Sequence, residues 1–262
     1  MIKIVINGAG GRMGKTVSSL AFSDPEFVIV GGIEAKNSKL IGKKLKEVCG
    51  LSQSVDSDVV ILDSLEKLTE IPDALIDFSE PKATLYAIEW AAKHSVPSVI
   101  GTTGFSNEQK EIIRKAAEKI PILLSSNMSY GMNVIFKFLP EISKYLNKFD
   151  TEIIEIHHKW KKDSPSGTAL TLAEKIGNKQ KNKVFSRYGV SIRKSEEIGI
   201  FAVRGGDVVG DHCIMFLGEG ERLEIVHRAT SREAFAKGAL IASKIIQKFR
   251  NKPGLLSYTD IL

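Results

Sequence analysis

Short apolar strands alternate with helix-forming stretches through the first half of the chain, and this order constrains the fold most strongly. Apolar runs such as IKIVING, FVIVGGIE, ALIDFS, PSVIGTT and PILLSS are separated by stretches with helical spacing, among them RMGKTVSSLAF and the segments after Pro81 and from Asn107. Such alternation is typical of a parallel sheet that helices cover on both faces. The sequence therefore predicts a doubly wound α/β domain over residues 1–127.

The pattern changes between residues 151 and 228, where the runs GIFAVRG, HCIMFLG and RLEIVHRA alternate with a period of two. This period is typical of antiparallel or mixed strands with one solvent-facing side. We therefore expect a smaller α+β domain with a mixed or antiparallel sheet over residues 128–229. The sequence TSRE after that domain predicts a capping box before the apolar helix FAKGALIASKIIQKF. We expect residues 230–262 to pack back onto the first domain and complete it.

A glycine-rich turn lies between the first predicted strand and the first predicted helix. The strict GxGxxG pattern fails because its third glycine falls on Met13, but glycines at 8, 11 and 14 form a variant of it. Glu34 ends the next strand 20 residues after Gly14, where a carboxylate would accept hydrogen bonds from ribose hydroxyls. A glycine turn needed only for packing is the alternative. The context favours a Rossmann-type dinucleotide site with contacts from Gly8, Ala9, Gly10, Gly11, Arg12, Met13 and Glu34.

The choice between NADH and NADPH stays open at this point. Glu34 would repel a ribose phosphate, whereas Arg12 and Lys36 could attract one. Two further loops follow later strands of the predicted parallel sheet, and ligands bind at the carboxyl ends of such strands. Ordinary turns are the alternative for either loop. The cofactor contacts predicted there are Gly101, Thr102, Thr103, Ser125, Ser126, Asn127 and Met128.

The segment EIHHKWKKDSPSGTA, residues 155–169, combines proton-transfer groups with an anion-binding turn. His157 and His158 follow an apolar strand, and lysines come directly after them. Ser166 precedes the predicted helix TALTLAEKIG, whose first N–H groups could hold a carboxylate. Each element alone would also suit an ordinary strand end, basic loop or helix cap. Their combination predicts an active site with a general acid, a cation and an anion-binding turn.

Composition limits the other classes of protein. Hydrophobic residues make up 43% and charged residues 26% of the chain, as in a globular protein. Cys49 and Cys213 have no metal-ligand spacing, so we expect neither a disulfide framework nor a metal site. No apolar run approaches the ~20 residues of a membrane span, and the chain starts directly with a strand pattern. We expect a soluble cytoplasmic protein.

The net charge of +6 suits either a nucleic acid or a small acidic ligand. Lysines gather at residues 36–46 and 175–183, but neither stretch contains interleaved aromatic residues. This pattern favours a solvated surface, and we expect neither a nucleic acid nor a membrane partner.

Six segments together resemble the 4-hydroxy-tetrahydrodipicolinate reductase family, also called dihydrodipicolinate reductases, over essentially the full length. They are GAGGRMG, DFSEP, GTTGF, SSNMSYGMNV, EIIEIHHKWKKDSPSGTA and VRGGDVVGDH. The segment with the two histidines is the most specific. Ser164 departs from the alanine that usual members carry, and Ala35 departs from an arginine that favours NADPH in some relatives.

The resemblance implies NAD(P)H-dependent reduction of a cyclic dicarboxylate to tetrahydrodipicolinate, on the route to diaminopimelate and lysine. It implies that His157 donates a proton and that Lys161 is a second catalytic cation; which of them delivers the final proton stays open. It also implies a homotetramer joined through the second domain. Alternatives are another two-domain reductase, such as a homoserine or aspartate dehydrogenase, and a non-enzymatic nucleotide-sensing or nucleic-acid-binding protein. The implied substrate contacts are Thr103, His158, Ser166, Gly167 and Thr168.

Overall fold

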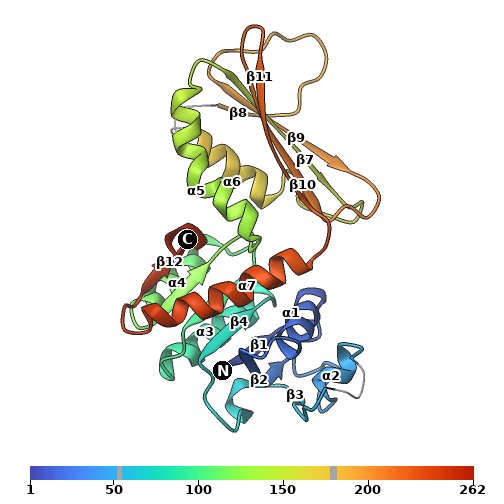
Figure 1. The fold of residues 1–262 in the computed structure, drawn as a ribbon, viewed down its shortest axis with the longest axis vertical. Coiled ribbons are helices and arrows are strands. Elements are labelled where there is room, and N and C mark those ends of the chain that lie inside the picture. The colour runs from blue at the N-terminus through green and yellow to red at the C-terminus, as the bar shows by residue number, and fades with distance from the viewer. Residues whose placement is uncertain (52–54, 178–181) are drawn as a thin grey trace. The chain divides into compact units, whose positions relative to one another are not determined.

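The computed structural model describes residues 1–51, 55–177 and 182–262, which form two compact units (Figure 1). The first unit, called unit 1, contains Met1–Tyr130 and Glu233–Leu262, and unit 2 contains Gly131–Arg232. Unit 1 therefore includes both ends of the chain. The lysine-rich stretch at 175–183 lies partly outside the described ranges. Within these ranges, every helix is too short or too polar to span a bilayer.

Unit 1 is built on a parallel sheet with the strand order β12-β6-β5-β4-β1-β2-β3. After β1 the chain adds strands on one side of it, and it then returns to add β4 on the other side. This reversal creates a switch point between β1 and β4, where ligands bind in open α/β sheets. The expected doubly wound sheet is confirmed. Its strands are β1 (Ile2–Asn7), β2 (Phe27–Ile33), β3 (Ile61–Leu62), β4 (Ala74–Asp77), β5 (Ser98–Ile100), β6 (Pro121–Leu124) and β12 (Gly254–Leu256).

Helices cover both faces of this sheet because neighbouring strand residues point to opposite sides. Ile4 and Ile76 pack in one buried cluster with residues of α1 and α7, whereas Val5 and Leu75 pack in a second cluster with residues of α3 and α4. The C-terminal helix thus belongs to the core of unit 1, and it continues as a 3₁₀ helix. The helical elements are α1 (Arg12–Phe22), α2 (Leu45–Val48), η1 (Leu65–Lys67), α3 (Pro81–Lys93), α4 (Asn107–Ala117), α7 (Glu233–Ile245), η2 (Ile246–Phe249) and η3 (Tyr258–Asp260).

Unit 2 contains a mixed sheet with the order β11-β10-β7-β9-β8. β10 is antiparallel to β7 and β11, whereas β9 is parallel to β7 and β8. The expected mixed sheet is confirmed. Figure 1 shows α5 and α6 on one side of it, where Phe136 and Leu172 pack against Ile153 and Ile214. The elements are α5 (Tyr130–Tyr145), β7 (Asp150–His157), α6 (Gly167–Ile176), β8 (Asn182–Phe185), β9 (Glu197–Arg204), β10 (Gly210–Leu217) and β11 (Arg222–Ala229).

Helix α7 approaches the chain before α5 so closely that only glycine fits at one position. A Cβ atom on Gly238 would lie 1.7 Å from the carbonyl oxygen of Met128. The carbonyl of Gly238 also accepts a 2.9 Å hydrogen bond from the hydroxyl of the buried Tyr258. Gly238 therefore fixes the distance between the C-terminal helix and the loop after β6.

We predict that Gly238→Ala lowers the free energy of unfolding by about 2 kcal/mol or more, because forcing the helix away from Met128 outweighs the ~1 kcal/mol that alanine gains in helix propensity. Denaturant unfolding of the wild type and the variant measures the difference. Lys237→Ala, at an exposed position of the same helix, is the control and should change stability by less than about 0.5 kcal/mol. Equal stability of the Gly238→Ala variant and the wild type would show that the helix adjusts without cost.

Candidate active site

The glycine turn connects β1 to α1 at the switch point of the parallel sheet. Gly8 has φ of +78°, and a Cβ there would lie 2.6 Å from the carbonyl oxygen of Phe78. A Cβ on Gly14 would lie 2.1 Å from the carbonyl oxygen of Gly8. Glycine is therefore required at both ends of the turn. The variant spacing still allows the backbone to approach a ligand at the N-terminus of α1.

Glu34 follows β2 directly and reaches the glycine turn. Its Oε1 atom accepts a 2.7 Å hydrogen bond from the amide of Gly10, and a Cβ on Gly10 would lie 3.0 Å from the same atom. The structure thus brings Glu34 to the turn, as predicted for a carboxylate that binds a ribose. Both residues suit an adenosine ribose beside a pyrophosphate at the α1 N-terminus.

The predicted loops after β5 and β6 lie at the same edge of the sheet as the glycine turn. The amide of Gly101 donates to the carbonyl of Asp77 over 2.9 Å, and a Cβ on Gly101 would collide with the ring of Phe78. Ser125 and Asn127 bond within their own loop, since the Ser125 hydroxyl donates to the Asn127 carbonyl over 2.7 Å. The structure buries Met128, a predicted cofactor contact, in the core beneath α7, with its carbonyl oxygen packed against Gly238 of that helix.

Sequence reasoning missed the role of Asp77, whose carboxylate is fully buried at the end of β4. It accepts hydrogen bonds from the Asn7 amide (2.6 Å), the Ser79 backbone amide (3.1 Å), and the hydroxyls of Thr84 (3.0 Å) and Thr102. These donors belong to the ends of β1, β4 and β5 and to α3. A buried carboxylate requires such donors, so Asp77 joins the loops that carry the predicted cofactor contacts. The segment DFSEP, which begins with Asp77, was the feature of the sequence that could have indicated this role.

In unit 2, His157 is the last residue of β7, and its ring is mostly buried. Its Nδ1 atom lies 2.5 Å from Oε2 of Glu155. A Cβ on Gly210 of β10 would lie 3.0 Å from Nε2, so the glycine gives the ring its space. The ring of His212 contacts that of His157 edge-on, with centroids 5.2 Å apart.

Glu155, which sequence reasoning also missed, is fully buried two residues before His157. Both guanidinium ends of Arg204 donate to it over 2.8 Å, and the backbone amide of Ser166 donates over 2.9 Å. Burial alone would favour the neutral acid, but the hydrogen bonds from His157, Arg204 and Ser166 hold the pKa of Glu155 down at about 2. The signal was the two-residue period, which places Glu155 and His157 on the same side of β7.

The loop after β7 carries the predicted cation. The ammonium of Lys161 forms a 2.9 Å ion pair with Asp163, and Arg204 donates to the carbonyl of Asp163 over 2.7 Å. The backbone amide of His158 donates to the carbonyl of Val208 over 2.8 Å. The structure therefore holds this loop against β9 and the segment that follows it.

Ser166 caps helix α6 at the end of the same loop. Its hydroxyl accepts from the amide of Ala169 and also bonds Nε2 of His212, each over 3.2 Å. The amides of Gly167 and Thr168 follow in the first turn of the helix. Burial is the main cause that lowers the pKa of His212 to about 3, so its ring is neutral at physiological pH. The predicted anion site at the start of α6 therefore lies beside His212, whose ring contacts that of His157.

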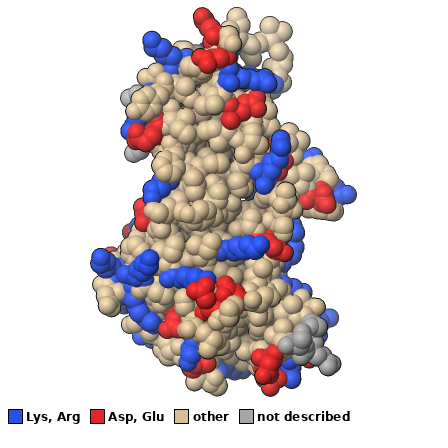
Figure 2. Space-filling model, in the orientation of Figure 1, with Lys and Arg blue, Asp and Glu red and all other residues tan. Residues whose placement is uncertain are grey.

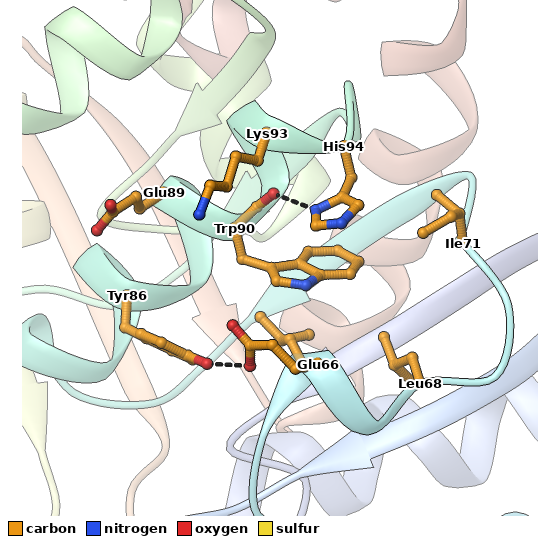
Figure 3. A pocket seen from close by; sticks show the side chains of 9 residues that line it. Glu66, Leu68, Ile71, Tyr86, Glu89, Trp90, Lys93 and His94 are labelled. Atoms are coloured by element: carbon orange, nitrogen blue, oxygen red, sulfur yellow. Dashed lines mark hydrogen bonds between the residues drawn. The ribbon is translucent and has the colours of Figure 1, made fainter.

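A cavity in unit 1 lies apart from all the predicted residues (Figure 3). It is formed by α3 and the segment 65–71, and the ring of His94 stacks on Trp90 with centroids 4.2 Å apart. The hydroxyl of Tyr86 donates to Glu66 at its opening. None of the predicted catalytic or binding residues lines it, so this cavity does not contribute to the candidate active site.

A glycine turn at the switch point of a parallel sheet, with imidazole, ammonium and helix N-terminus in a second unit, defines a two-domain nucleotide-dependent oxidoreductase. Residues 2–128 match the family model described as dihydrodipicolinate reductase, N-terminus, and residues 131–262 match the model for its C-terminus. The chain belongs to the dihydrodipicolinate reductase family.

Full-length relatives carry the same description. The chain is 43% identical over 266 residues to a 4-hydroxy-tetrahydrodipicolinate reductase of Aquifex aeolicus, covering 100% of this chain and 98% of the relative. It is 42% identical to the reductase of Methanocaldococcus jannaschii, with 100% and 97% covered. A solved dihydrodipicolinate reductase from Paenisporosarcina, described as dipicolinate bound, matches with a TM-score of 0.77 and 27% identity over both full chains.

The expected family, fold class and use of NADH or NADPH by an oxidoreductase are thereby confirmed. The aspartate dehydrogenase of Thermotoga maritima shares only the fold, at a TM-score of 0.51 and 13% identity. The roles of the individual residues stay predictions.

We predict that Glu155 makes the stability of the protein depend on pH in the acid range. Its pKa is about 2 in the folded chain and 4.5 when unperturbed, so its ionisation contributes about 3 kcal/mol above pH ~5, which is lost as pH falls toward 2. The difference in unfolding free energy between wild type and Glu155→Gln should therefore shrink over that range. Urea unfolding at several pH values measures it.

The control is Glu141→Gln, because Glu141 and its partner Lys144 are both exposed. This change should alter the free energy of unfolding by less than about 1 kcal/mol. The difference in unfolding free energy between the wild type and Glu155→Gln could instead stay constant from neutral pH to pH ~2.5. That result would contradict an ionised Glu155 in the folded protein.

Proposed function

We propose that this chain reduces 4-hydroxy-tetrahydrodipicolinate to tetrahydrodipicolinate in diaminopimelate and lysine biosynthesis. The observation that carries the proposal is the cluster at the end of β7, where His157, Lys161 and the N-terminus of α6 come from one short segment. The full-length relatives named for this reaction support it, as does the solved relative with bound dipicolinate, a cyclic dicarboxylate.

Unit 1 is the proposed dinucleotide-binding domain, which we assign to residues 1–127 together with 230–262. When bound, NADH or NADPH supplies the hydride. The backbone of Gly8–Met13 receives the pyrophosphate at the N-terminus of α1, and Glu34 receives the ribose. The loops at 101–103 and 125–128 line the nicotinamide side. The close approach of Glu34 to Gly10 supports these assignments.

Unit 2 is the proposed substrate domain, residues 128–229. The amides of Gly167 and Thr168 and the hydroxyls of Ser166 and Thr168 bind one carboxylate of the substrate, because a helix N-terminus favours an anion. Lys161 binds a carboxylate in exchange for Asp163. His158 and Thr103 complete the substrate contacts.

Proton transfer completes the reaction after hydride reaches the ring carbon, because the resulting enamine must gain a proton. We assign this step to His157 through its Nε2 atom, since Nδ1 is bonded to Glu155. Lys161 is the second candidate donor. Lys161 lies four residues after His157 in the same segment, and its ammonium forms an ion pair with Asp163.

A homotetramer joined through unit 2 remains a prediction, as does a cytoplasmic location. The side chains of Val203, Leu223 and Val226, on β9 and β11, are each about half exposed, which suits burial against other copies of the chain. On the face drawn in Figure 2, basic and acidic side chains are interspersed. This face therefore has no continuous basic surface of the kind typical of nucleic-acid binding.

The deciding experiment supplies the product of the upstream synthase and follows the loss of reduced-nicotinamide absorbance with NADH and with NADPH. Homoserine, aspartate and their oxidised counterparts serve as the substrate panel for the rival dehydrogenases, whose fold is shared. Turnover of the synthase product alone supports the proposal. Turnover of a panel substrate instead, or tight salt-sensitive DNA binding without turnover, would reject it.

We predict that His157→Gln lowers kcat by about 10²-fold or more with little change in KM, because it removes the proton donor and keeps the shape of the site. Thr168→Ala should instead raise KM for the substrate about tenfold, through the loss of a bond to a charged carboxylate. Steady-state kinetics separates the two effects. Thr171→Ala, at a half-buried position one turn further along α6, is the control, and an unchanged kcat in His157→Gln would exclude His157 as the donor.

We predict that Glu34 and Lys36 have opposite effects on the choice of cofactor. Glu34→Ala removes a carboxylate that repels a ribose phosphate, so the ratio of kcat/KM for NADPH to that for NADH should rise about tenfold. Lys36→Ala should lower the same ratio. The ratio is the appropriate measure, because loss of the Gly10 bond weakens the binding of both cofactors. If both variants keep the wild-type ratio of kcat/KM for NADPH to that for NADH, the adenosine ribose does not bind beside Glu34 and Lys36.

A further inference from the structure

A fully buried carboxylate, that of Glu155, lies behind the imidazole of His157. The sheet register explains why its partners meet there. Arg204 of β9 pairs with His157 across the strands, and His212 of β10 pairs with Glu155 itself. The strands on both sides of β7 therefore contribute residues around the carboxylate of Glu155. Because Glu155 is fully buried, we do not expect it to contact a substrate.

Each oxygen of Glu155 receives two hydrogen-bonding groups. Oε1 accepts from the Ser166 amide over 2.9 Å and from Arg204 Nη2 over 2.8 Å. Oε2 accepts from Arg204 Nη1 over 2.8 Å and lies 2.5 Å from His157 Nδ1. An ionised carboxylate is only an acceptor, so His157 must donate through Nδ1. The neutral ring then carries its proton on Nδ1 and its lone pair on Nε2, so Nε2 takes up a proton from solvent before it donates one to the substrate.

We infer that Glu155, held by Arg204, is a positioning residue that fixes the tautomer and orientation of His157 so that Nε2 is the nitrogen that exchanges a proton with the substrate. The inference rests on the proposed function, in which His157 is the proton donor. Glu155 acts through His157 and touches neither substrate nor cofactor.

The same carboxylate also fixes the distance between the proton donor and the anion site. The Ser166 amide that it binds belongs to the residue that caps α6. Arg204 extends the connection to the loop of Lys161 through the carbonyl of Asp163. Removing the charge of Glu155 therefore disturbs the relative placement of three groups that bind one substrate.

An isosteric amide cannot satisfy these partners. The amide side chain of a Glu155→Gln variant offers one acceptor oxygen and one donor group, whereas all four partners are donors in the wild type. Arg204 and the Ser166 amide cannot accept, so the amide hydrogen would face His157 and make its Nδ1 the acceptor. The neutral His157 ring then carries its proton on Nε2. The imidazolium that donates from Nε2 would place its Nδ1–H against the amide N–H, which disfavours the donor form.

The test is ¹⁵N spectroscopy of the histidine side chains in the full-length protein without substrate, at a pH where the His157 ring is neutral. The His157→Gln spectrum identifies the signal. We expect the Nδ1–H tautomer in the wild type and the Nε2–H tautomer in Glu155→Gln. An Nε2–H tautomer in the wild type, or an unchanged tautomer in the variant, would overturn the inference.

Kinetics supplies the second measurement. Glu155→Gln should lower kcat by about 10²-fold or more, with KM for the reduced cofactor within about twofold. In the His157→Gln background the same change should lower kcat less than about twofold further, because two residues that act through one group are not additive. A full additional loss in that background would show that Glu155 acts independently of His157.

Glu152→Gln is the matched control. Glu152 is a nearly buried carboxylate on the same strand, bound by Arg187 and Arg193, and its loss should leave the His157 tautomer and kcat unchanged. If Glu155→Gln does not fold because Arg204 lacks an anion, the pair Glu155→Gln with Arg204→Gln removes both charges. The pair should show the same loss of the Nδ1–H tautomer, and retention of that tautomer would overturn the inference.

The two proposals fail in different ways. If His157→Gln retains full turnover, the assignment of His157 as the donor fails, whatever the tautomer. If His157→Gln is inactive but Glu155→Gln keeps both the wild-type tautomer and its turnover, the donor assignment stands and the positioning role of Glu155 is rejected.

Discussion

A buried carboxylate must be surrounded by hydrogen-bond donors, and this constraint organises the ligand-binding end of each unit. In unit 1, Asp77 gathers neutral donors from the ends of three strands and one helix. In unit 2, Glu155 gathers a guanidinium, an imidazole and a backbone amide. Burying either carboxylate without these partners would be strongly unfavourable, so the loops that provide them are held in one arrangement before any ligand binds. Such preorganisation is what a site for hydride and proton transfer requires.

The chemical difference between the two carboxylates follows from their partners. Asp77 binds only uncharged donors and serves to hold loops together. Glu155 binds an arginine, which balances its charge, and a histidine, whose tautomer we infer that it fixes. The first arrangement suits a backbone that receives a cofactor, whereas the second suits a group that moves a proton.

Much of the fold could be predicted because its signals are local. Helix α1 begins directly after the glycine turn, and α6 begins at Gly167, one residue before the predicted start, with the Ser166 hydroxyl as its cap. The predicted helix at 235–249 instead begins at Glu233 and becomes 3₁₀ after Ile245. Strands β3 and β12 have only two and three residues, too short for a period to show. Helix α5 was not predicted, and it contains Pro140, a residue that ordinarily argues against a helix interior.

The site was predictable to the extent that its residues are neighbours in sequence. His157, Lys161 and the start of α6 come from one segment, so the sequence alone placed them together. The partners of the two carboxylates come from distant positions: Thr102 is 25 residues from Asp77, and Arg204 is 49 residues from Glu155. Only the strand order and register bring them together, and a single sequence does not contain that information. The fold, in turn, does not separate this chain from an aspartate dehydrogenase.

The division of the chain also has a consequence for its synthesis. Unit 1 needs both termini, since β12 completes its sheet and α7 its core, whereas unit 2 is one continuous stretch. Segments emerge from the ribosome in order. All residues of unit 2 are therefore synthesised before the last residues of unit 1. Unit 1 must therefore wait, with one side of its sheet only partly covered by α1, until residues 233–262 have been synthesised.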